Sequence, residues 1–344
     1  MANRIPALSA SSKSFFPATK VSSTETYIYQ YMKLFCIYYL YVIPQNETVS
    51  FLISRHYPLE ENINYCFVGI RRCGKSYMMY QQIQNLLEKK IPLSQIVYVN
   101  FEDERLLEMT ADDLNTILEI GLELSGAGNK PYLFLDEIQN IDGWEKFVRR
   151  IADMKYRISI TVSNSKMLSS EIASTLGGRF VIMNIYPYSF TEYLIANGKE
   201  KNYLDTISTS DKADLLSQYN KYVTYGAFPE LVEIKNKRTF LSSIYQTVYL
   251  GDIITRNKIT NDFAVKLILK KIAESITKPL SFTRLTNIVN SSGTSLGKQT
   301  VINYVGYMND EPNASPASLN AKAISKLLVG LYTCSLCSPN TISL

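Results

Sequence analysis

One segment of the sequence has the residue types and spacing of a loop that binds phosphate, G-x-x-x-x-G-K-S/T. Such a loop turns its backbone N–H groups toward phosphate oxygens, and the helix that follows adds its positive N-terminal end. Lys75 would reach the β- and γ-phosphates of a nucleotide, and the Ser76 hydroxyl would ligate Mg²⁺. We expect the nucleotide to contact the loop and the residue after it: Gly69, Ile70, Arg71, Arg72, Cys73, Gly74, Lys75, Ser76 and Tyr77.

An acidic pair, Asp136 and Glu137, directly follows an apolar run later in the chain. Asp136 would lie on the metal side of the site, and Glu137 would be the base that polarises the attacking water. A base beside the metal-side carboxylate favours hydrolysis over simple nucleotide binding. A site for guanine would be expected to show Asn-Lys-x-Asp, which residues 164–167 (NSKM) do not match, so ATP is the expected nucleotide.

Two further polar residues are candidates for a hydrolytic site. Asn164 follows an apolar run and would place an amide between the acidic strand ends to orient the water, although an ordinary turn explains it too. Arg179 follows two glycines and would stabilise γ-phosphate charge in a neighbouring subunit of a homo-oligomer. The alternative for Arg179 is a solvated turn.

The elements that must position these residues alternate between short apolar runs and amphipathic stretches. This alternation predicts an α/β fold, a parallel sheet with helices on both faces. The expected strands are 65–69, 96–101, 132–135, 158–162 and 180–185, and the expected helices are 76–89, 111–124 and one around Trp144. From about residue 190 the pattern is nearly all helical, with three amphipathic helices within 263–310.

The chain divides into five segments. We expect an N-terminal extension over 1–45, a P-loop domain over 46–195, a helical region over 196–255, a segment over 256–310 that is winged-helix-like by family resemblance, and an irregular tail over 311–344. The extension contains an aromatic run, 27–43, that has neither helical nor strand periodicity.

Composition excludes several classes of protein. Hydrophobic residues make up 46% and charged residues 19%, as in an ordinary globular protein. A single histidine, His56, rules out a histidine-rich metal centre. Five scattered cysteines predict no disulfide framework and a reducing cytoplasm. We find no signal peptide, and the charge-free apolar stretch 34–45 is too short to cross a membrane.

The segment 256–307 is rich in basic residues, which suggests a DNA or protein partner. Residues 281–290 and 297–307 have the pattern of a helix–turn–helix, whose second helix could enter a groove of DNA. The alternative is a fold that serves only for packing between domains. The basic residues are Arg256, Lys258, Lys266, Lys270, Lys271, Lys278, Arg284 and Lys298, and the acidic ones are Asp262 and Glu274.

Several motifs in order resemble those of the bacterial and archaeal AAA-type ATPases with an uncharacterised C-terminal domain. They are 67–76 (FVGIRRCGKS), 100–103 (NFED), 135–139 (LDEIQ) with Trp144, 176–179 (LGGR), 186–193 (YPYSFTEY), 225–229 (YGAFP) and 252–256 (DIITR). The resemblance covers roughly 45–310 and implies a P-loop core with an additional strand, a helical region and a winged-helix-like segment. It also implies that Asn164 is the sensor and Arg179 the arginine finger.

Three features depart from this family. Val162 stands where the family usually has glycine before the sensor, and about the first 40 residues have no recognisable counterpart. After residue 310 the family would continue into a nuclease-like module rich in strands, whereas 311–344 is rich in Ser, Ala and Asn. This tail resembles the product of a frameshift or a truncated gene.

We therefore expect a Mg²⁺-dependent ATPase of the AAA type that couples hydrolysis to a conformational or regulatory task on an unknown partner. The alternative is a nucleotide-gated DNA-binding or scaffold protein with little turnover. Glu137 discriminates between the two, because hydrolysis needs this base and a nucleotide sensor does not. A small-molecule kinase is a weaker third possibility, since the sequence reveals no pocket for its substrate.

Overall fold

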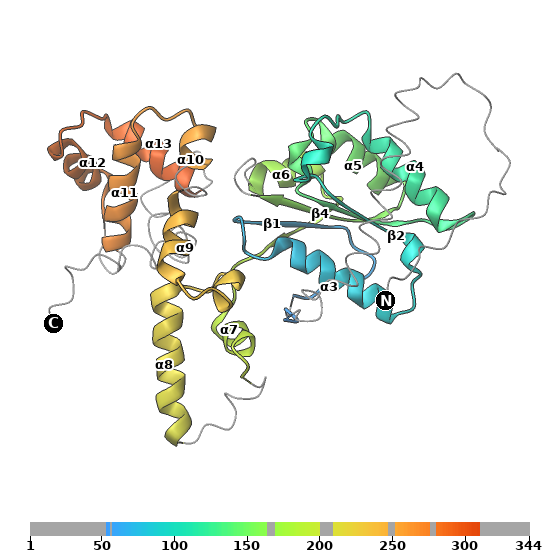
Figure 1. Ribbon diagram of the computed structural model, residues 1–344. Coiled ribbons are helices and arrows are strands. Elements are labelled where there is room, and N and C mark those ends of the chain that lie inside the picture. The colour runs from blue at the N-terminus through green and yellow to red at the C-terminus, as the bar shows by residue number, and fades with distance from the viewer. Residues whose placement is uncertain are drawn as a thin grey trace.

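The computed structural model describes residues 53–55, 57–163, 169–199, 209–246, 252–275 and 280–309. These residues form an α/β part that contains a sheet, followed by a series of helices (Figure 1). The features predicted for His56, Asn164, the aromatic run 27–43 and the tail 311–344 lie outside the described residues.

The sheet has five parallel strands, which confirms the predicted α/β class and the strands expected from the apolar runs. Its order is β2-β3-β4-β1-β5, and every pairing is parallel. The carboxyl ends of the strands therefore lie along one edge, which is where open α/β sheets bind ligands. The strands are β1 (Tyr65–Gly69), β2 (Ile96–Asn100), β3 (Tyr132–Asp136), β4 (Arg157–Ser163) and β5 (Val181–Asn184).

Helices cover both faces of the sheet, as the alternating pattern predicts. The helix α3 (Lys75–Glu88) packs on the face that presents Tyr65 and Phe67 of β1. The opposite face, with Cys66 and Val68, is covered by α4 (Leu114–Ser125), α5 (Trp144–Asp153) and α6 (Ser169–Leu176) (Figure 1). Because β1 is buried on both faces, its sequence is continuously apolar.

The part of the chain after β5 is helical, as predicted. A short 3-10 turn, η4 (Pro229–Val232), packs with α9 in a small core around Phe228 and Leu231. The helices are α7 (Phe190–Ala196), α8 (Thr209–Tyr225), α9 (Lys237–Ile244), α10 (Asp252–Arg256), α11 (Asp262–Glu274), α12 (Phe282–Ser291) and α13 (Lys298–Asn309).

The last three helices confirm the amphipathic helices expected within 263–310. They share a core that includes Ile268, Leu285 and Val301. The winged helix predicted for 256–310 stays a prediction, because the described residues of this segment show helices and no hairpin. None of the helices in the described ranges has the length and apolar character needed to cross a membrane.

Candidate nucleotide-binding site

The predicted phosphate loop, residues 69–76, lies at the carboxyl end of β1 and leads directly into α3. Two glycines are required by its geometry. Gly74 has φ 97°, in the left-handed region. At Gly69 an added Cβ would come within 2.4 Å of the Ile185 carbonyl oxygen, so no side chain fits there. The loop therefore has the close turn at the mouth of a helix that phosphate binding requires.

The remaining loop residues divide between the core and the surface. Ile70 packs against the cluster around Phe228, and Cys73 is buried, which raises the pKa of its thiol. Arg72 is exposed and pairs with Glu230 of η4, its Nη1 lying 2.7 Å from Oε2. Arg71 and Tyr77 line the same cleft as Lys75.

The Lys75 ammonium is buried within the loop, with only 4% of the residue exposed. Its Nζ donates hydrogen bonds to the carbonyl oxygens of Gly69 and Ile70, each at 3.3 Å. It also forms an ion pair with Glu137, Nζ to Oε1, at 3.3 Å. The structure thus brings together the predicted phosphate-binding lysine and the predicted base.

Asp136 ends β3 as a buried carboxylate held by hydroxyl groups. Tyr98 donates to its Oδ2 at 2.7 Å, Thr161 donates to its Oδ1, and the Ser76 hydroxyl is also hydrogen-bonded to it. Burial and the adjacent Glu137 raise the pKa of the Asp136 carboxyl, while these hydrogen bonds act to lower it. The two predicted metal-side residues, Ser76 and Asp136, are therefore in contact.

This donor set fits Mg²⁺, a hard cation that takes oxygen ligands. Mg²⁺ typically uses one or two carboxylates together with phosphates of the substrate and keeps several waters. Among the described residues, no group of three or more His, Cys, Asp or Glu side chains is placed to hold a metal ion. Ser76 and Asp136 would therefore hold Mg²⁺ together with a nucleotide.

Glu137 follows β3 in the left-handed region, with φ 52°. Its backbone N–H donates to the Thr161 hydroxyl at 2.7 Å, and its carboxylate accepts from the Gln139 amide. Burial acts to raise the pKa of Glu137, but the Lys75 ammonium and hydrogen bonds from Gln139 and Ser163 bring it below its ordinary value. Glu137 is therefore a carboxylate at neutral pH, the form that can accept a proton.

A cleft of about 890 Å³ extends from the phosphate loop. Its polar end contains Lys75, Ser76 and Glu137, which suits phosphate groups. Its other walls have apolar side chains from three places in the chain: Ile53, Tyr188 and Ile195, and Val232, Phe240 and Ile244. The charged residues Arg71, Arg72, Glu102, Glu230 and Glu233 also line it. An apolar wall beside a phosphate cradle suits the base of a nucleotide.

The family comparison agrees with this geometry. Residues 62–194, which span the sheet and the phosphate loop, match the family model described as an AAA domain. These residues are an AAA domain. A second model, described as a domain of unknown function (DUF8612), matches residues 216–311. The AAA domain is thus followed by a helical domain to which no activity is assigned.

Two curated relatives of the chain are uncharacterised. A protein of Methanocaldococcus jannaschii is 34% identical over 245 residues, which are 70% of this chain and 53% of the relative. A protein of Haemophilus influenzae is 29% identical over 270 residues, 75% of this chain and 65% of the relative. The chain therefore spans between about half and two thirds of the length of these relatives.

The solved structures to which the chain shows similarity include two proteins in complexes. The ORC1 protein of Aeropyrum pernix, in complex with DNA, has a TM-score of 0.33 at 11% identity, and the match covers 90% of this chain and 94% of the ORC1 chain. The AMPPCP-bound DnaA of Aquifex aeolicus has a TM-score of 0.30 at 13% identity, and the match covers 82% of this chain and 84% of the DnaA chain. Scores this low establish no functional parallel.

Arg179 of the AAA domain lies far from its own phosphate loop. It precedes β5 at the amino edge of the sheet, where Val181 pairs with Tyr65, whereas the loop follows Gly69 at the carboxyl edge. Its guanidinium makes a two-point ion pair with Asp153 at 2.7 and 3.0 Å, on the surface. The finger role in a neighbouring subunit stays a prediction, and so does the sensor role of Asn164, outside the described residues.

Two polar residues of the AAA domain site were not assigned a role from the sequence. Gln139 donates through Nε2 to Glu137 and to the Ser163 hydroxyl, while its Oε1 is buried without a hydrogen-bond partner among the described residues. Tyr98 holds Asp136 from the neighbouring strand β2. Gln139 ends the motif 135–139 quoted above, whereas the only sequence signal of Tyr98 is a polar group within an apolar strand.

Proposed function

We propose that this chain is a Mg²⁺-dependent ATPase whose site lies in the cleft at the phosphate loop. One observation carries the proposal: the Lys75 ammonium, the Glu137 carboxylate and the Asp136–Ser76 pair converge at one edge of the sheet. These are the groups that phosphoryl transfer to water needs, namely a cation for the phosphates, a metal-side carboxylate and a base.

Each residue has a distinct task in this mechanism. The loop N–H groups and Lys75 bind the β- and γ-phosphates, and Ser76 and Asp136 would hold Mg²⁺, which neutralises phosphate charge when it is bound. Glu137 accepts the proton of the attacking water, because its low pKa leaves it ionised. Gln139 holds Glu137 in orientation through its amide.

The ion pair between Lys75 and Glu137 supports a site that is inactive until nucleotide arrives. While the Lys75 ammonium is paired with Glu137, the ion pair engages the carboxylate that should act as the base. Phosphate oxygens would draw the ammonium toward the nucleotide, which leaves Glu137 free to act on water. The base is thus released by the substrate that it serves.

The cleft also supports a conformational task. Its apolar walls come both from the AAA domain and from η4 and α9, and Arg72 of the loop pairs with Glu230 of η4. A nucleotide in this cleft would contact both parts, so binding and hydrolysis would change how they sit together. The partner that receives this movement is unknown.

The alternative, a nucleotide-gated DNA-binding protein, rests on the helix pair α12 and α13. Of the basic residues of 256–307, three lie on the preceding helix α11, where Lys266 pairs with Asp262 and both Lys270 and Lys271 pair with Glu274. Lys258, Arg284 and Lys298 are exposed and take part in none of the ion pairs among the described residues. Two carboxylates therefore offset part of the charge of α11, while Lys258, Arg284 and Lys298 stay available to a phosphate backbone.

The test is steady-state ATP hydrolysis by the parent chain and by Glu137→Gln. The amide keeps the shape of the carboxylate but cannot take a proton, so we expect turnover to fall about a hundredfold or more with ATP affinity retained. Calorimetry of ATP binding provides the affinity. Equal turnover in the two proteins would place the base elsewhere than Glu137, and absence of turnover in the parent would favour the DNA-binding alternative. Adding duplex DNA to the assay tests that alternative directly.

A further inference from the structure

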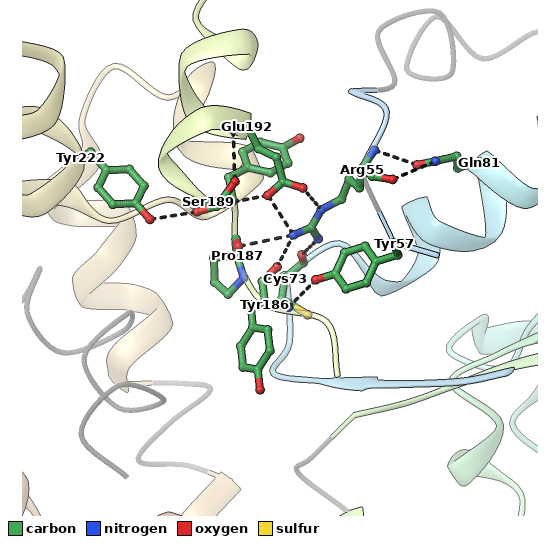
Figure 2. A network of polar contacts seen from close by, with 10 residues as sticks. Arg55, Tyr57, Cys73, Gln81, Tyr186, Pro187, Ser189, Glu192 and Tyr222 are labelled. Carbon is green, nitrogen blue, oxygen red and sulfur yellow. Dashed lines mark hydrogen bonds and ion pairs between the residues drawn. The ribbon is translucent and has the colours of Figure 1, made fainter. Parts of the chain in front are cut away.

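Arg55, in the segment before β1, is a buried arginine that belongs to none of the recognised motifs. Only 5% of the residue is exposed, although its guanidinium carries a full charge. Figure 2 shows its side chain reaching between the phosphate loop and α7. Its Nη1 donates to the Cys73 carbonyl at 3.1 Å, its Nη2 to the Tyr186 carbonyl at 2.7 Å, and its Nε to Glu192 Oε1 at 2.9 Å.

The position of Arg55 is fixed from several sides. Its backbone N–H donates to Gln81 Oε1 at 3.0 Å, and Gln81 Nε2 returns a hydrogen bond to its carbonyl at 3.1 Å, which ties it to α3 (Figure 2). The rings of Tyr57 and Tyr188 lie 5.2 and 5.5 Å from the guanidinium carbon. The planar fork is therefore held in one orientation before any ligand binds.

The contact with Cys73 acts on the phosphate loop itself. In a trans peptide the C=O and N–H groups point in opposite directions, so the carbonyl of Cys73 and the N–H of Gly74 are oriented together. With the carbonyl held by Arg55, the Gly74 N–H points away from Arg55. Since Gly74 lines the cleft, this contact sets the direction in which its N–H is offered to a phosphate.

The contact with Glu192 acts on α7. This helix begins with a capping box, in which the Ser189 hydroxyl accepts from the Glu192 N–H and Glu192 Oε2 accepts from the Ser189 N–H. Arg55 pairs with the same carboxylate, and Ile195 at the other end of α7 lines the cleft. One side chain therefore joins the phosphate loop to a wall of the cleft.

We propose that Arg55 is a positioning residue for nucleoside di- and triphosphates, a role that rests on the proposed nucleotide site. It holds the Cys73–Gly74 peptide in its binding orientation and couples that peptide to α7. Lysine cannot replace it, because a single ammonium with three donors cannot span the loop carbonyl, the Tyr186 carbonyl and both oxygens of Glu192. The effect is on binding of the phosphates, and it is the same in the ground state and the transition state.

The test compares Arg55→Lys with the matched control Arg157→Lys. Arg157, at the start of β4, also forks onto a preceding segment, bonding the carbonyl and side-chain oxygens of Asn62 at 3.1 and 2.8 Å, but far from the loop. We expect Arg55→Lys to weaken Mg-ATP and Mg-ADP binding by the same factor, about tenfold, measured by calorimetry. KM for ATP should rise equally while kcat stays within about threefold of the parent value, the signature of lost uniform binding. Arg157→Lys should match the parent in its affinity for both nucleotides, in KM and in kcat.

A second variant covers the case in which Arg55→Lys does not fold. Glu192→Gln keeps the shape of the side chain that pairs with Arg55 and should also weaken the binding of both Mg-ATP and Mg-ADP. If Arg55→Lys folds and has the affinity and KM of the parent, the inference is overturned while the proposed function stands. If Arg55→Lys does not fold, parental affinity in Glu192→Gln has the same consequence. A parent chain that binds neither nucleotide would overturn both.

Discussion

At the scale of single residues, the site depends on charges placed where water is scarce. Lys75 and Glu137 are both largely buried and paired with each other, and Asp136 has hydroxyl partners on its oxygens. A buried charge is tolerated only with such partners. The same arrangement leaves the lysine able to exchange one anionic partner for another, which is what a phosphate requires.

Replacing Lys75 with alanine should weaken ATP binding. The lost charge-assisted contact contributes about 1.5–3 kcal/mol, so we expect Kd to rise by about ten- to a hundredfold. Calorimetry measures this, and Lys89→Ala is the control, because Lys89 follows the same helix but pairs with Glu61 on the surface. Equal affinity in Lys75→Ala and the parent would mean that the phosphate loop is misassigned.

At the scale of elements, short contacts fix where each helix begins relative to the sheet. The loop places α3 at the end of β1, and the capping box places α7 after β5. Both starts converge on Arg55, through Cys73 and through Glu192. The local signals for the two helices are independent in the sequence, and the contacts of Arg55 join the two helix starts in space.

This ion pair predicts a pH dependence of stability. Burial acts to raise the pKa of Glu192, but hydrogen bonds from Arg55 and Ser189 bring it below its ordinary value of 4.5. A carboxyl whose pKa is lowered by folding contributes stability above its unfolded pKa and loses it as the pH falls through the folded value. Urea unfolding from pH 7 to pH 3 should therefore show a steeper loss of stability for the parent than for Glu192→Gln.

The control for this measurement is Glu61→Gln, which removes a carboxylate from an exposed pair with Lys89. Exposed pairs contribute little, so this variant should follow the parent curve. Parallel curves for the parent and Glu192→Gln would show that the buried pair does not contribute to acid sensitivity.

At the scale of the whole molecule, the AAA domain carries its phosphate loop and Arg179 at opposite edges of the sheet. One chain cannot bring Arg179 to its own loop without taking the sheet apart. If Arg179 serves hydrolysis, it serves a neighbouring chain and must exchange Asp153 for phosphate.

We therefore predict that ATPase activity per chain rises with protein concentration. Arg179→Ala should lose most activity, and mixing it with Lys75→Ala should restore part of it, because one mixed interface pairs an intact loop with an intact arginine. Arg150→Ala removes an exposed arginine on α5 instead, and this control variant should behave as the parent. Total activity strictly proportional to concentration, together with full activity of Arg179→Ala, would refute the finger role.

The parts of this protein that its sequence predicts are those that depend on near neighbours. The strands β1, β2 and β3 are mostly apolar because they are buried on both faces, whereas the edge strand β5 is partly exposed. The ends of all five strands differ by at most one residue from the expected ones. The phosphate loop and the pair Asp136–Glu137 are short motifs whose chemistry requires adjacent residues. Parallel pairing then brings their strand ends to one edge, as the α/β pattern implies.

Other features arise only when distant segments meet. Arg55 contacts residues 131 and 137 positions away, and no periodicity or motif marks it as buried. Tyr98 reaches Asp136 because β2 and β3 are neighbours, and three lysines of α11 pair with the two carboxylates Asp262 and Glu274 of the same helix. The physical reason is the same in each case: the energy of a buried or paired charge depends on what surrounds it in space, and folding sets those surroundings.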